Sequence, residues 1–87
     1  MTFEVIARKS AKKFIDDLQS DERGRVEEKI KGLANDPFPH EVVRVHGRPD
    51  EKIFRVRVGS YRILYVVDFE KQLIVIDSVD KRSRVYD

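Results

Sequence analysis

Cysteine is absent from the 87-residue chain, and long apolar runs are missing as well. Without cysteine the chain cannot form a disulfide, use thiol chemistry or build a cysteine-based zinc site. No apolar run approaches the length of a membrane span, and the N-terminus shows no signal-peptide pattern. We therefore expect a cytoplasmic protein without a membrane partner.

Common catalytic motifs are also missing. The sequence contains neither a glycine-rich phosphate-binding motif nor a nucleophile elbow. Its two histidines, His40 and His46, fall in expected loops and lack the spacing of a helical metal site. We expect no metal and no cofactor. A histidine acid–base pair for RNA cleavage is an open alternative, although nothing in the sequence connects these two residues to the basic residues described below.

Length and charge point to one small domain with an uneven charge distribution. A chain of 87 residues fits a single domain spanning residues 1–87, and one core of this size gives only a few kcal/mol of net stability. We therefore expect a partner chain to contribute to stability. The net charge is only +2, but from Val42 onward ten lysines and arginines face seven acidic residues. Positive charge is thus concentrated in the second half.

Hydrophobic periodicity predicts an α+β fold. Residues 2–6 alternate weakly and predict a short strand, whereas apolar residues recur at helical spacing from about residue 8 to 18 and again from about 20 to 34. Ser20 is the expected N-cap of the second helix. Four more strands are expected at residues 42–45, 54–58, 61–65 and 73–79. This order predicts a sheet of four or five mostly antiparallel strands, with two N-terminal helices packed on one face.

Residues 54–65 predict a β-hairpin rich in arginine. Two alternating runs flank Gly59 and Ser60, and glycine at the first central position suits a two-residue turn. Arg57 then lies opposite Arg62, with Arg55 two residues along on the same face. Such a like-charge pair costs about 0.2–1 kcal/mol, whereas an anion between the guanidinium groups would turn the cost into a gain. The hairpin is either a phosphate-binding face or a solvated polar face.

The C-terminal residues extend this basic character. They include three cationic side chains and one aromatic ring: Lys81, Arg82, Arg84 and Tyr86. If the tail crossed the open face of the sheet, cations and a ring would converge, as binding of single-stranded RNA requires. A frayed basic terminus is the alternative.

The same residues make the chain similar to toxins of the RelE/ParE superfamily, from bacterial and archaeal type II toxin–antitoxin systems. The resemblance covers nearly the whole chain and is carried by the strand–helix–helix–meander order and by four segments. They are His46-Gly47-Arg48-Pro49-Asp50, Ile53-Phe54-Arg55-Val56-Arg57-Val58, Gly59-Ser60-Tyr61-Arg62-Ile63-Leu64-Tyr65, and Lys81-Arg82 with Tyr86. The resemblance implies a RelE-like fold.

The RelE branch of that superfamily implies an activity. Its members enter the ribosomal A site and cut mRNA without a metal, by attack of a 2′-hydroxyl on the adjacent phosphate. By resemblance, Arg62 stabilises charge on the phosphate, Arg82 assists the leaving 5′-oxygen, and Tyr86 stacks on or positions the nucleotide. Arg55 and Arg57 stand where well-known members have lysines. Because arginine is a poor general base, the proton acceptor stays open, and catalysis would rest mainly on positioning and electrostatic stabilisation.

The resemblance also implies partners and alternatives. Lys81 and Arg84 would contact ribosomal or messenger phosphate. A RelB-like antitoxin would neutralise the toxin, and operator DNA would be contacted only indirectly, through the toxin–antitoxin complex. The ParE branch shares the fold but inhibits DNA gyrase, so a gyrase inhibitor is one alternative. A catalytically inactive member that only binds its antitoxin is the other.

Overall fold

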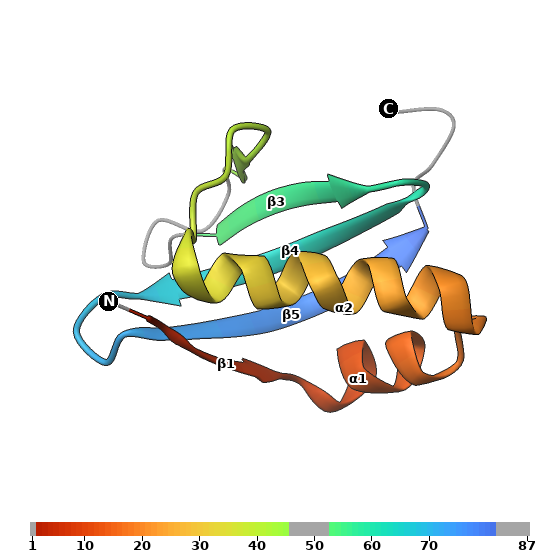
Figure 1. Ribbon diagram of the computed structural model, residues 1–87. Helices are drawn as coiled ribbons and strands as arrows, with labels where there is room; N and C mark the ends of the chain where they lie inside the picture. The colour runs from red at the N-terminus through yellow and green to blue at the C-terminus, as the bar shows by residue number, and fades with distance from the viewer. Residues whose placement is uncertain (1, 46–52, 82–87) are drawn as a thin grey trace.

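The computed structural model describes residues 2–45 and 53–81, which form two helices and five strands. Strand β1 and both helices come first, and four strands follow (Figure 1). The elements are β1 (Glu4–Ala7), α1 (Lys9–Asp16), α2 (Ser20–Asn35), β2 (Val43–Val45), β3 (Ile53–Val58), β4 (Tyr61–Asp68) and β5 (Leu73–Lys81). The expected element order is confirmed.

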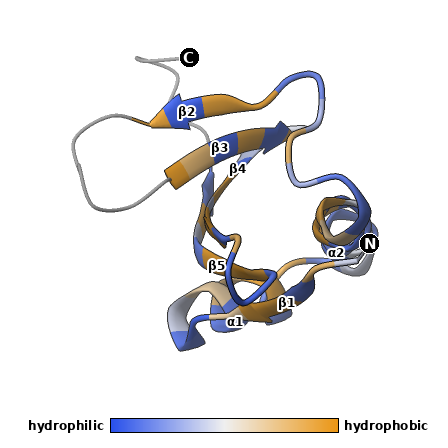
Figure 2. Ribbon diagram, turned by 90° about the vertical axis from the view of Figure 1, so that its left-hand side faces the viewer, coloured by the Kyte–Doolittle hydropathy of each residue, from blue (hydrophilic) through white to orange (hydrophobic). Residues whose placement is uncertain are grey.

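The five strands form one mixed sheet in the order β1-β5-β4-β3-β2. Strand β1 runs parallel to β5, and all other neighbouring strands are antiparallel. Both helices cover the same face of this sheet, which curves around them (Figure 2). The expected α+β architecture is therefore confirmed, and neither helix in residues 2–45 and 53–81 covers the second face of the sheet.

The helices differ in detail from the expectation. Helix α1 has only eight residues, fewer than the three turns expected. Helix α2 begins at Ser20, and Gln19 is its N-cap without a side-chain cap hydrogen bond, so the predicted capping role of Ser20 is wrong. Asp21 and Glu22 do lie in the first turn, where negative charge is favourable near the helix N-terminus.

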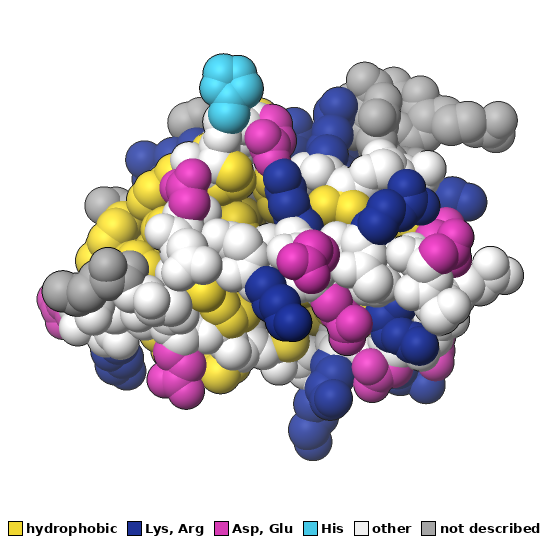
Figure 3. Space-filling model, in the orientation of Figure 1, with side chains coloured by type: hydrophobic (Ala, Val, Ile, Leu, Met, Phe, Trp, Pro, Cys, Tyr) yellow, Lys and Arg dark blue, Asp and Glu magenta, His cyan; other side chains and the backbone are white. Residues whose placement is uncertain are grey.

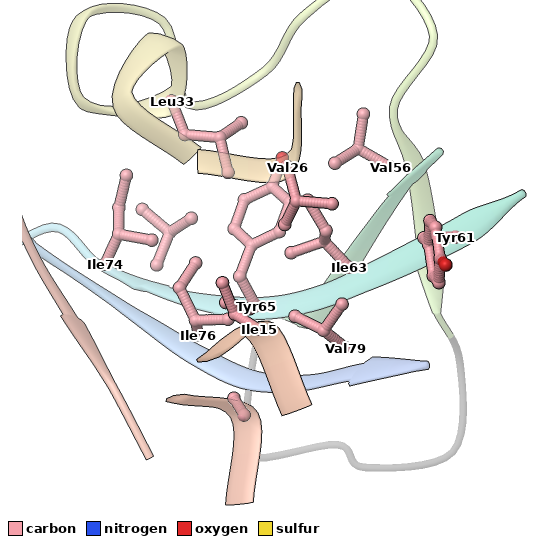
Figure 4. Packing of buried hydrophobic residues seen from close by; sticks show 12 residues of the cluster. Ile15, Val26, Leu33, Val56, Tyr61, Ile63, Tyr65, Ile74, Ile76 and Val79 are labelled. Atoms are coloured by element: carbon pink, nitrogen blue, oxygen red, sulfur yellow. The ribbon is translucent and has the colours of Figure 1, made fainter. Parts of the chain in front are cut away.

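The core lies between the helices and the sheet (Figure 4). Its members come from α1, α2 and the three central strands, and they are Ala11, Ile15, Val26, Leu33, Val56, Tyr61, Ile63, Tyr65, Val67, Ile74, Ile76 and Val79. The Tyr65 side chain extends across this layer, and its hydroxyl donates a hydrogen bond to the Pro37 carbonyl oxygen at 2.6 Å. This bond ties strand β4 to the segment that follows α2.

The hairpin of β3 and β4 has the predicted register. Val58 pairs with Tyr61 and Arg57 pairs with Arg62. Gly59 has a φ of +56° at the first central position of the turn, which glycine adopts at little cost because it has no Cβ. Two-residue turns of this kind match the twist of the flanking strands.

Strands β4 and β5 pair with a shift in register. Leu64 pairs with Ser78 but Tyr65 pairs with Ile76, so Asp77 is the extra residue on β5. A bulge of this kind reverses the alternation of side chains along a strand. Consequently Ile76 and Val79, three residues apart, both point into the core.

Candidate nucleic-acid interface

The open face of the sheet carries the three arginines of the hairpin. Val56 and Ile63 point into the core beneath the helices, and side chains alternate along a strand. Arg55, Arg57 and Arg62 therefore point to the opposite face, which we call the arginine face. The sequence-based expectation that these three residues share one face is confirmed.

One cross-strand row at the end of this face combines two cations and one anion. Arg62 lies between Arg57 on β3 and Asp80 on β5, directly opposite both in the register. Its Nε donates a hydrogen bond to Asp80 Oδ1 at 3.2 Å, and the Arg62 side chain is 21% exposed. The predicted like-charge pair exists, but Asp80 offsets part of its repulsion.

Sequence reasoning missed Asp80. Its position opposite Arg62 depends on the bulge at Asp77. The four residues between β4 and β5 allow several registers, so the sequence carried no signal that singled out Asp80. The alternation expected for residues 73–79 would have placed Ser78, not Val79, on the side of the core.

A cavity of about 240 Å³ opens beside the arginines, next to residues of β2 and β3. It is lined by Glu41, Val43, Arg55 and Arg57. Glu41 forms an ion pair with Lys29 of α2. The hydrogen bond from Lys29 lowers the pKa of the Glu41 carboxyl, which therefore stays ionised at neutral pH. The rim thus presents two cations and one fixed anion around an apolar valine.

The remaining expected site residues are placed differently. Lys81 is the last residue of β5 and pairs with Tyr61, so it lies on the helix side of the sheet and not on the arginine face, and it does not extend past the strand as expected. Arg82, Arg84 and Tyr86 lie outside the described residues, as does His46. His40 is exposed, in the segment between α2 and β2.

The helix side has a different charge pattern. Cationic and anionic side chains alternate over α1 and α2 on this surface (Figure 3). Within residues 2–45 and 53–81, no group of three or more histidine, cysteine or acidic side chains could hold a metal ion. No helix in this part of the chain is long and apolar enough to cross a membrane.

Comparison with known proteins gives a consistent family assignment. A family model described as the ParE toxin of the type II toxin–antitoxin system parDE matches residues 3–86. The curated toxin-family protein RelE1 of Methanocaldococcus jannaschii is 30% identical over 99% of this chain and 97% of its own length.

Solved structures agree. A chain of the archaeal RelE–RelB complex from Pyrococcus horikoshii has a TM-score of 0.85 at 30% identity, covering 97% of this chain and 99% of that one. Isolated RelE toxin of E. coli has a TM-score of 0.74 at 28% identity, covering 97% of this chain and 90% of that one. The chain therefore belongs to the RelE/ParE superfamily of type II toxins.

Proposed function

We propose that this toxin cleaves mRNA on the ribosome, by attack of a ribose 2′-hydroxyl on the adjacent phosphate without a metal. The observation that carries the proposal is that Arg55, Arg57 and Arg62 share the face of the sheet opposite the helices. Arginine binds phosphate through paired N–H donors. The similarity to RelE toxins in sequence and fold supports the same activity.

The three arginines would have different roles, according to their positions on the sheet. Arg62 stands in the row with Arg57 and Asp80, where its guanidinium would stabilise the negative charge that develops on the attacked phosphate. Arg55 and Arg57 line the adjacent cavity and would hold the RNA backbone on either side of the cut. Arg55 would also assist activation of the 2′-hydroxyl through its charge, since arginine does not accept a proton at neutral pH.

The end of the chain would complete the site. The segment that carries Arg82, Arg84 and Tyr86 follows Lys81 directly, and β5 ends beside the turn between β3 and β4 (Figure 1). In the proposed reaction Arg82 assists the leaving 5′-oxygen and Tyr86 stacks on the nucleotide. Arg84 contacts phosphate, and Lys81 contacts the ribosome from the helix side of the sheet.

A RelB-like antitoxin is the proposed partner outside the ribosome. Several of the similar solved structures are toxin–antitoxin complexes, including the P. horikoshii RelE–RelB complex and the intact E. coli RelBE complex. Because this domain is small, an antitoxin laid over it would add substantially to the buried apolar surface. Operator DNA would be bound through that complex and not by the toxin alone.

Inhibition of DNA gyrase is the second candidate function. The observation that favours it is the family model, which is described as a ParE toxin and matches residues 3–86. A gyrase inhibitor needs no phosphodiester site on the sheet, so the arginine face is the feature that separates the two proposals.

Primer extension on a defined message tests the proposal directly. The toxin is expressed briefly in cells that lack the antitoxin, with and without the start codon of the reporter message. Cuts inside translated codons that disappear with the start codon would support ribosome-dependent cleavage. Growth arrest with intact message and inhibited supercoiling would refute it in favour of gyrase inhibition. No arrest at all would indicate a member that only binds its antitoxin.

A further inference from the structure

Asp80 of β5 forms a hydrogen bond and an ion pair with Arg62, one of the three residues of the arginine face. Asp80 Oδ1 accepts a hydrogen bond from Arg62 Nε at 3.2 Å, and the two residues are directly opposite in the register of β4 and β5. The Arg62 side chain is 21% exposed and that of Asp80 is 50% exposed. The pair therefore lies at the surface, where RNA can reach it.

The fold places Asp80 on this face by an irregular feature. Strand β5 would present Ser78 to the core if its alternation continued from Ile74 and Ile76. The bulge instead brings Val79 into the core, where it is 4% exposed, and the next residue, Asp80, points to the arginine face. Bulges commonly re-aim a side chain in this way.

The charges on the two neighbouring strands both favour displacement of the Arg62 guanidinium toward β5. Arg57, on the neighbouring strand, repels the Arg62 guanidinium, and Asp80, on the other neighbouring strand, attracts it. Arginine has a long, flexible side chain with five N–H donors. The Asp80 carboxylate oxygen that accepts the hydrogen bond from Nε restrains the orientation of the guanidinium plane. Arg62 is thus oriented before RNA arrives.

We propose that Asp80 is a positioning residue that holds Arg62 in the orientation needed to stabilise charge on the attacked phosphate. This role rests on the proposed function as an mRNA endonuclease. Asp80 does not touch the RNA in this proposal and transfers no proton. It acts only through Arg62, because a preorganised donor needs no rearrangement as the reaction proceeds.

The proposal predicts opposite effects on rate and binding. Replacing Asp80 with alanine releases the guanidinium, and misplacement of a catalytic group by about 1 Å costs up to about 100-fold in rate. The same change removes a negative charge beside the phosphate site, so binding of RNA should be unchanged or tighter. A residue that simply contributed to RNA binding would show weaker binding instead.

The test is single-turnover cleavage of a defined message on translating ribosomes, measured across toxin concentrations. Asp80→Ala should lower the maximal rate constant by about 10- to 100-fold, with an equal or lower half-saturating concentration. Asp80→Asn, which keeps an acceptor oxygen, should recover most of the rate. Glu4→Ala is the matched control, because Glu4 lies on the same face at the distant edge strand β1, and it should leave both parameters unchanged.

A second measurement detects the contact between Asp80 and Arg62 independently of cleavage activity. In ¹⁵N-labelled protein the Arg62 Nε–Hε resonance should exchange slowly with water, and Asp80→Ala should make this exchange fast while the amide spectrum of the core stays unchanged. Wild-type rate and exchange in Asp80→Ala would overturn the proposal. Wild-type toxin that leaves the message intact would instead overturn the proposed function, and the positioning role with it. Loss of amide dispersion throughout Asp80→Ala, with no rescue by Asp80→Asn, would overturn the proposal in favour of a structural role.

Discussion

Removal of one hydroxyl group should measurably weaken this fold. The Tyr65 side chain is fully buried, and its hydroxyl donates to the Pro37 carbonyl oxygen at 2.6 Å. Burial raises the pKa of the Tyr65 hydroxyl well above its usual value, so it remains a donor at all ordinary pH values. In Tyr65→Phe the Pro37 oxygen loses this donor. A buried acceptor left without its partner costs about 1–3 kcal/mol, and because Pro37 is only half-buried we expect about 1–2 kcal/mol.

Urea unfolding followed by circular dichroism measures this loss. For a chain of this size the free energy of unfolding falls by about 1 kcal/mol per molar urea, so the midpoint should fall by about 1–2 M at an unchanged slope. Tyr61→Phe is the matched control. Tyr61 is also a tyrosine of the core, but its side chain is 8% exposed whereas that of Tyr65 is fully buried, so loss of the Tyr61 hydroxyl should lower the midpoint less. Equal midpoints for Tyr65→Phe and the wild type would show that the hydrogen bond to Pro37 does not stabilise the fold.

Three further predictions concern stability. Gly24→Ala and Gly32→Ala should each stabilise the protein by about 0.5–1 kcal/mol, because both glycines lie inside α2 with nothing within 4 Å of an added Cβ; a lower thermal midpoint for either variant would contradict this. Leu33→Ala should cost about 2–5 kcal/mol, because Leu33 is 1% exposed in the core, and a loss below the Tyr65→Phe value in the same urea assay would be inconsistent with its packing. The Glu41 pKa is lowered from 4.5 by the hydrogen bond from Lys29, so its contribution is present above that pH and lost as the pH falls through the folded-state pKa. Glu41→Gln should therefore reduce the fall of the urea midpoint between neutral and acid pH, and an identical fall in both proteins would argue against the pair.

The hairpin was predictable because a single local feature determines it. A two-residue turn with Gly59 first allows only one pairing of the flanking residues, so the opposition of Arg57 and Arg62 follows from the sequence. The core positions of Tyr61 and Tyr65 follow from the same alternation. The sequence of the turn was therefore enough to predict which arginines share the arginine face.

Features that depend on distant packing were not predictable. Asp80 faces Arg62 only because of the bulge at Asp77, and the four-residue connection between β4 and β5 does not determine the register of β5. The early end of α1 likewise depends on how the helices pack, since intrinsic preferences alone are weak. The roles of Arg82, Arg84 and Tyr86 remain predictions from the family resemblance.

Cleavage by purified protein tests whether the arginine face is the catalytic site. Translating ribosomes that carry a defined message are mixed with wild-type toxin, Arg62→Ala or Arg44→Ala, and the 3′ ends of the products are identified. Arg44 is the matched control, because it is an exposed arginine of the same sheet that pairs with Phe54 and points away from the arginine face.

Wild-type toxin and Arg44→Ala should cut the message and leave 2′,3′-cyclic phosphate ends. Arg62→Ala, folded by circular dichroism, should cut about 10²–10³-fold more slowly, the usual loss when one charge-stabilising contact is removed. Cleavage by Arg62→Ala at the rate of Arg44→Ala would contradict the assignment of the arginine face as the catalytic site.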